Sequence, residues 1–165
     1  MVKADWTIYE EDYWAINSVL KELIDNSNSQ SVLLIDKTGQ LIASVGMEPE
    51  FDLMSFASLC AADFEANAQL AKLIGEKDFS TLYHQGSDES MYLARVAQSI
   101  ILVVLFNKRT TLGLVRLRVK KAVEGLNTVL NGLFDKLEYE NEDLKEFDEE
   151  FADELNREID SLFQD

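Results

Sequence analysis

The side chains that could carry out chemistry are few in this sequence. It contains one cysteine, Cys60, and one histidine, His84, which is too few for an internal disulfide or a tetrahedral Cys/His metal site. No phosphate loop of the GxxxxGK[ST] type, no GxGxxG turn, no HExxH pair and no GxSxG elbow occurs. We therefore predict no catalytic residue, no metal and no cofactor, with Cys60 as a small buried apolar side chain and His84 as a structural or surface residue. An enzyme with an unrecognised site is the alternative.

Carboxylates are abundant, and they could in principle bind a cation. The 165 residues carry 31 acidic and 15 basic side chains, a net charge of -16, and 13 acidic but only two basic residues lie between Glu138 and Asp165. The spacing of a calcium loop is absent, and no glycine follows Gly132. We interpret these carboxylates as a solvated helix face. The net charge repels phosphates, so we expect neither nucleic acid nor anionic lipid as a partner.

The basic residues, in contrast, are concentrated near residue 115. Six of the 15 are Lys108, Arg109, Arg116, Arg118, Lys120 and Lys121. They could supply an arginine finger or a phosphate site, and the simpler alternative is an exposed helix face. Arg116, Lys120 and Lys121 could also bind an acidic partner, including the acidic end of this chain.

An apolar stripe runs through the acidic C-terminal segment. Its members, at steps of three or four, are Leu144, Phe147, Phe151, Leu155, Ile159 and Leu162, with Phe163 beside them. This spacing predicts an amphipathic helix, and the large side chains predict that it binds a partner. An isolated helix of this length with repelling carboxylates is marginal in water, so we expect it to order when docked.

The preceding elements follow from the hydrophobic periodicity. The first is a helix whose apolar residues are Tyr9, Tyr13, Ile16, Leu20 and Leu23, and two strands follow at 31–36 and 40–46 around a DKTG turn. A second helix extends from the N-cap Asp52 to Gly75. Three strands at 81–86, 90–97 and 100–106 then precede a third helix, whose apolar seam runs from Leu112 to Leu133. This order, α-β-β-α-β-β-β-α, predicts an α/β (α+β) sandwich with helices on both faces of a five-stranded antiparallel sheet. We place the domain at 1–137 and an acidic tail at 138–165.

The second helix has two usable sides. One stripe consists of Leu53, Ala57, Cys60, Phe64, Ala68 and Ala71, and the other consists of Leu59, Ala62, Ala66, Leu70 and Leu73. We predict that the first covers the sheet. The second has small side chains that would let another helix approach closely, and the alternative is a helix buried on all sides.

Two observations bear on location. No apolar run approaches the roughly 20 residues of a membrane helix, so we expect no membrane insertion. The opening MVKADWTIYEEDYW lacks the basic and then apolar pattern of a secretory signal. With a single cysteine, this favours the cytoplasm.

The element order, with DKTGQLIASVG in the hairpin, LAKLIGE closing the second helix and TTLGLVRLRVKKA opening the third, resembles the Roadblock/LC7 family. The resemblance implies a homodimer that joins through the edge strand near 81–86 and through the second helices. It also implies a bacterial Ras-like small GTPase as partner, in the control of cell polarity or motility. Members of this kind stimulate GTP hydrolysis without donating a catalytic side chain.

The resemblance also assigns roles to residues. Those expected to meet the GTPase are Ala62, Glu65, Ala66, Gln69 and Lys72, and the tail helix would reach a second surface of the same partner. The family is richer in Ala and Gly where this chain reads DFEANAQ, at 63–69. The alternative is therefore a scaffold or interaction protein that does not stimulate the GTPase.

Overall fold

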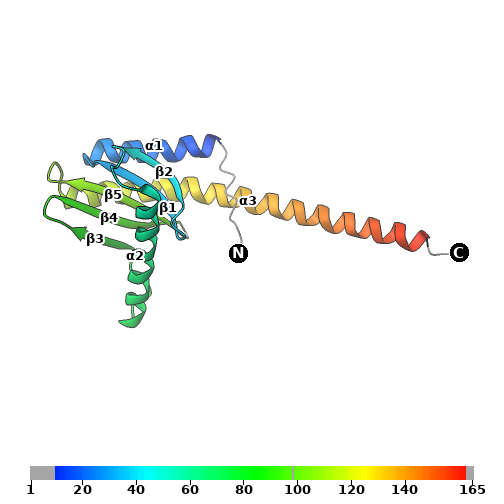
Figure 1. Cartoon of the computed structure of the whole chain (residues 1–165). Coiled ribbons are helices and arrows are strands. Elements are labelled where there is room, and N and C mark those ends of the chain that lie inside the picture. Colours follow the sequence, from blue (N-terminus) through cyan, green and yellow to red (C-terminus); the bar gives the residue numbers. More distant parts are fainter. Residues whose placement is uncertain (1–9, 98, 163–165) are drawn as a thin grey trace. The chain divides into compact units, whose positions relative to one another are not determined.

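We analysed a computed structural model that describes residues 10–97 and 99–162 (Figure 1). The elements are α1 (Glu10–Ser27), β1 (Ser31–Asp36), β2 (Leu41–Gly46), α2 (Leu53–Leu73), β3 (Thr81–Gln85), β4 (Glu89–Val96), β5 (Ile100–Asn107) and α3 (Leu112–Leu162). Their order is the one predicted. Tyr9 and Phe163, expected in the first helix and in the tail helix, lie outside the described residues.

The five strands form one sheet in the order β2-β1-β5-β4-β3, and every neighbouring pair is antiparallel. The two strands next to each other inside the sheet, β1 and β5, are rich in Val, Ile and Leu, and all six residues of β1 are buried. A strand buried on both faces needs such a composition. The predicted α+β fold with a five-stranded antiparallel sheet is confirmed, and β3 is an edge strand.

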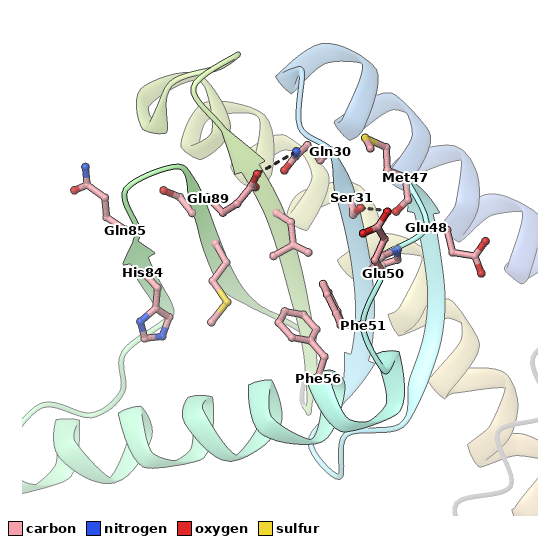
Figure 2. A pocket seen from close by; sticks show the side chains of 15 residues that line it. Gln30, Ser31, Met47, Glu48, Glu50, Phe51, Phe56, His84, Gln85 and Glu89 are labelled. Atoms are coloured by element: carbon pink, nitrogen blue, oxygen red, sulfur yellow. Dashed lines mark hydrogen bonds between the residues drawn. The ribbon is translucent and has the colours of Figure 1, made fainter.

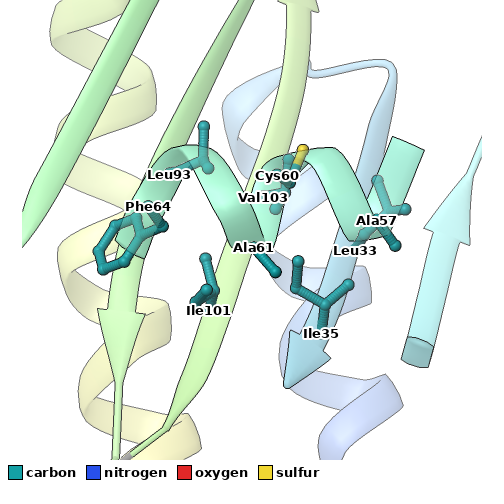
Figure 3. Packing of buried hydrophobic residues seen from close by; sticks show 9 residues of the cluster. All are labelled: Leu33, Ile35, Ala57, Cys60, Ala61, Phe64, Leu93, Ile101 and Val103. Carbon is teal, nitrogen blue, oxygen red and sulfur yellow. The ribbon is translucent and has the colours of Figure 1, made fainter. Parts of the chain in front are cut away.

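One face of the sheet packs against α2 (Figure 3). The buried cluster on this face consists of Leu33, Ile35, Ala57, Cys60, Ala61, Phe64, Leu93, Ile101 and Val103. Because three of the four α2 residues in it are small, the helix lies close to the strands, and Phe64 supplies the bulk. The predicted inner stripe therefore does cover the sheet.

The other face packs against α1 and the first part of α3. Successive strand residues point to opposite faces, so Val32, Leu34 and Leu102 point away from the α2 cluster, and all three are buried. Ile16 and Leu20 of α1 are also fully buried, as are Val115 and Leu126 of α3. These two helices touch each other as well, because a Cβ at Gly125 would lie 3.5 Å from a methyl group of Val19.

Local interactions fix the ends of α2 and the turn beside it. The Asp52 carboxylate caps the helix by accepting a hydrogen bond from the Met54 N–H, and Gly75, with φ of +84°, follows its last turn. In the β1–β2 turn, Oδ1 of the buried Asp36 accepts hydrogen bonds from the backbone N–H groups of Thr38 at 2.8 Å and Gln40 at 3.0 Å. These bonds fix the shape of the turn, and Gly39 within it lies close to Ser58 in the first half of α2.

The longest element, α3, is helical from Leu112 to Leu162. The chain forms two compact units, residues 1–130 and 131–165. The domain boundary predicted at 137/138 lies within α3 and stays a prediction. Every residue from Glu138 to Leu162 is exposed. In the described ranges, no helix is long and apolar enough to cross a membrane, and no three His, Cys, Asp or Glu side chains gather as metal ligands.

Candidate functional site

The side of α2 that faces away from the sheet is apolar and exposed. It carries Leu59, Ala62, Ala66, Leu70 and Leu73, of which Leu59 is 69% exposed and Leu73 is 83% exposed. Such a row of large apolar side chains is unusual on a surface that meets only water. The prediction of one covered and one open side is confirmed, and the alternative of a fully buried helix is wrong.

The five residues expected to meet a partner all lie on this open side. Ala62, Glu65, Ala66, Gln69 and Lys72 are exposed, and steps of three or four residues keep them on one face of the helix. Nε2 of Gln69 donates a hydrogen bond to Oε1 of Glu65 at 2.7 Å. The structure thus brings the five together, and their contact with a partner stays a prediction.

The backbone of β3 presents a free sheet edge beside α2. The Arg95 N–H donates to the Ser80 carbonyl and the Gly86 N–H donates to the Glu89 carbonyl, both at 2.9 Å. In an antiparallel ladder the direction alternates, so the even residues of β3 bond to β4. The N–H and C=O groups of Thr81, Tyr83 and Gln85 therefore point outward, where another strand could pair.

A side-chain contact connects this edge to α2. Nε2 of His84 lies 2.5 Å from Oδ2 of Asp63, and both side chains are partly exposed. Sequence analysis did not predict this contact, because 21 positions separate the two residues. The open side of α2 and the free edge of β3 consequently belong to one continuous surface.

An apolar groove opens on the same face of the sheet, between α2 and the strands (Figure 2). Its volume is about 720 Å³, and we call it the acidic groove. The apolar lining is Phe51, Phe56, Met91 and Leu105, and the carboxylates at its rim are Glu48, Glu50 and Glu89. The rings of the two phenylalanines lie 4.7 Å apart. Such a lining suits apolar side chains of a neutral or basic partner and repels an acidic one.

Sequence analysis missed the acidic groove. Its lining comes from the segment around Pro49, from the start of α2 and from β1, β3, β4 and β5, and no single stretch of sequence carries a pattern for it. The one feature of the local sequence that points to the groove is the pair of large apolar residues, Met47 and Phe51, that flank Pro49. The structure shows both as exposed.

Cys60 has the structural role that was predicted for it. It belongs to the buried cluster beneath α2, and burial, assisted by the charge of Asp63, raises the pKa of its thiol to about 11. The thiolate is the reactive form of cysteine. At neutral pH this side chain is therefore a small apolar group.

The basic residues of α3 do not form a single patch. Arg116 and Lys120 line a second groove, of about 520 Å³, beside β3 and β4. Lys121 is directed toward α1 instead and donates a hydrogen bond to Oε1 of Glu22 at 2.6 Å. That hydrogen bond, together with the lysine charge, holds the pKa of Glu22 below its ordinary value. The binding of an acidic partner by any of the three stays a prediction.

The six described residues of the tail stripe are exposed side chains of α3. They are Leu144, Phe147, Phe151, Leu155, Ile159 and Leu162. The predicted helix and its apolar side are present, and its role in binding stays a prediction.

Comparisons with known proteins agree with this architecture. The family model described as Roadblock/LC7 domain matches residues 15–106. The solved structure of Myxococcus xanthus MglB is 44% identical over 77% of this chain and 96% of that chain, with a TM-score of 0.72. A structure described as MglB with a tetrameric arrangement is 30% identical over 80% and 99%, with a TM-score of 0.74. The gliding protein MglB from Thermus thermophilus is 30% identical over 78% and 97%, with a TM-score of 0.72.

Proposed function

This chain belongs to the Roadblock/LC7 family, and from this premise we propose that it is a cytoplasmic homodimer that binds a bacterial Ras-like GTPase of the MglA type and stimulates its GTP hydrolysis. In this role it would act in cell polarity or motility. The observation that carries the proposal is the exposed apolar side of α2, because its side chains do not belong to the buried core of the chain.

The homodimer is supported by the free edge of β3. Pairing of two such edges would continue the sheet across both copies and satisfy the outward N–H and C=O groups. The same contact would bring the two α2 helices toward each other, because His84 of β3 already touches Asp63 of α2. Ala62 and Ala66 offer little bulk, so two helices could approach closely.

The dimer can be tested by a substitution at the edge. Gln85→Pro removes one outward N–H and leaves the even-numbered bonds to β4 intact. We expect sedimentation equilibrium to show a monomer for Gln85→Pro and a dimer for Gln85→Ala, which keeps the N–H. A dimer of unchanged affinity in the proline variant would rule out pairing through β3.

Stimulation would operate by contact alone. A surface that binds the hydrolysis-competent conformation of the GTPase more tightly than its other conformations shifts the population toward it. The catalytic groups would then belong to the GTPase.

The experiment is single-turnover GTP hydrolysis by an MglA-type GTPase of the same organism, with and without this protein. We expect a faster rate with the wild type and no acceleration with Ala66→Arg, which places a long cation on the open side of α2. Thr128→Arg is the matched control, because Thr128 is an exposed residue of α3. Equal acceleration by both variants would exclude the α2 surface.

A second candidate function is a scaffold that binds the GTPase without stimulating it. It is favoured by Glu65 and Gln69, whose bonded side chains add bulk to the open side of α2. The same assay separates the two, since a scaffold would bind the GTPase and leave its rate unchanged. If the GTPase did not bind at all, both functions would be excluded.

A further inference from the structure

The second groove lies on the sheet face that α1 and α3 cover, beside the β3 edge. It measures about 520 Å³, and we call it the basic groove. Buried Tyr92, Ala94 and Val119 form its floor, and Leu117, which is 61% exposed, stands at its side. The groove is thus an apolar depression that α1 and α3 leave open.

Its rim is positively charged. Arg116 and Lys120 are exposed and lie one helical turn apart on α3. Within the described part of the chain, neither forms an ion pair, whereas Arg95, which also lines the groove, is paired with Asp78. Two unpaired cations beside an apolar floor match a ligand that carries apolar side chains and carboxylates together.

This chain contains a segment of that chemistry. Residues 144–162 combine the exposed apolar stripe with eight acidic and two basic residues. The acidic groove would repel this segment, because Glu48, Glu50 and Glu89 stand at its rim. The charges therefore select the basic groove of the two.

The period of the stripe favours docking of this helix into a groove over its pairing with an identical helix. From Leu144 to Leu162 the stripe advances 18 residues in five steps, which is the 3.6-residue period of a straight helix, whereas a coiled-coil seam follows a 3.5-residue period. Two copies of this helix side by side would also bring carboxylates together. A straight helix with one apolar side suits helix-in-groove binding.

We propose that the acidic helix 144–162 of one copy docks into the basic groove of a second copy, with its apolar stripe on Tyr92, Leu117 and Val119 and its carboxylates beside Arg116 and Lys120. The charges of the two surfaces assign the acidic helix to the basic groove, and the experiment below separates a contact between two copies from a contact within one chain.

The dimensions limit how much of the stripe can dock at once. The α3 wall from Arg116 to Glu124 is about 12 Å long and the stripe is about 27 Å long, at 1.5 Å per residue. One groove therefore takes about half of the stripe, leaving the remainder exposed. The contact involves no GTPase, so it stands or falls independently of the function proposed above.

The test is photo-crosslinking in the full-length chain. A benzophenone amino acid replaces Leu117, or in a second preparation the exposed Glu124, and unlabelled chains are mixed with ¹⁵N-labelled chains before irradiation. We expect crosslinks to peptides within 144–162 that join one labelled and one unlabelled chain. A probe at Phe51, in the acidic groove, should give none of these crosslinks.

Charge recognition is tested in the same assay. Lys120→Glu should lower the crosslink yield about fivefold, the size of one exposed ion pair, and higher salt should lower it for the wild type. Lys37→Glu, an equal charge change at an exposed position in the β1–β2 turn, should leave the yield unchanged. Crosslinks within single chains would overturn the second-copy assignment. Crosslinks elsewhere, none at all, or equal effects of the two variants would overturn the docking itself.

Discussion

The two faces of the sheet are covered to different degrees. Two helices, α1 and α3, cover one face and leave the basic groove open beside Leu117. A single helix, α2, covers the other face and leaves the acidic groove open beside it (Figure 2). That helix is also apolar on its outer side. The α2 face is therefore the one on which the covering helix itself carries a row of exposed leucines.

Opposite charges at the two grooves extend this contrast. Carboxylates stand at the rim on the α2 face, and Arg116 and Lys120 stand at the rim on the other face. Charge would therefore sort a partner between the two grooves before any close packing. The difference teaches that one small domain can carry two grooves of opposite charge on opposite sides of its sheet.

The largest expected effect comes from the inner side of α2. Phe64→Ala should lower the free energy of unfolding by about 3–5 kcal/mol, because it leaves a cavity beneath the helix. Leu59→Ala, on the outer side of the same helix, should change it by about 0.5 kcal/mol or less. Urea denaturation measures both. Equal losses would mean that the two sides of α2 do not differ in the way described.

Cys60 reports the same contrast through its reactivity. With a pKa of about 11 in place of 9.0, the folded protein holds about 100-fold less thiolate at pH 8. Alkylation by iodoacetamide should be slower by at least that factor than in urea, and its rate should keep rising toward pH 11. Ionisation is disfavoured in the fold, so this group's contribution to stability is complete below pH 9 and lost as the pH rises through 11. Equally fast alkylation of the folded protein would contradict burial of this side.

The energetic effect of the contact between the β1–β2 turn and α2 can be measured by comparing substitutions at two glycines. Gly39 has a φ of +86°, and a Cβ there would lie 2.6 Å from the Cα of Ser58 on α2, whereas Gly75 has a φ of +84° and nothing within 4 Å. Gly75→Ala should cost about 1 kcal/mol through backbone strain alone. Gly39→Ala should cost more than about 2 kcal/mol, since the clash adds to similar strain. Identical unfolding midpoints would show that α2 is not held by the turn.

The smallest effect is expected from the tail. Removal of residues 138–165 should change the free energy of unfolding by about 0.5 kcal/mol or less, because every described residue from Glu138 on is exposed. The truncated chain should stay folded and dimeric, with altered affinity for its partner. Thermal unfolding followed by circular dichroism measures the first part. A chain that no longer folds would mean that the stripe belongs to the core.

Sequence reasoning worked where information is local. The change of period from 3.6 to 2 separates helices from strands, and the ends of α2 follow from Asp52 and Gly75. The apolar composition of Ile100–Asn107 agrees with the position of that strand inside the sheet. The domain boundary predicted at 137/138 lies within α3 and stays a prediction. No proline or glycine near residue 137 marks an end.

The sequence by itself determined the order of the elements, the family, the two-sided character of α2 and the acidic amphipathic segment. Each of these depends on residues that are neighbours in the chain or one helical turn apart. Only the tertiary structure decided that His84 meets Asp63, and that Arg116 and Lys120 share a groove while Lys121 pairs with Glu22. Those outcomes depend on how α1, α2 and α3 pack on the sheet. The grooves are the places that side chains from distant segments leave unfilled.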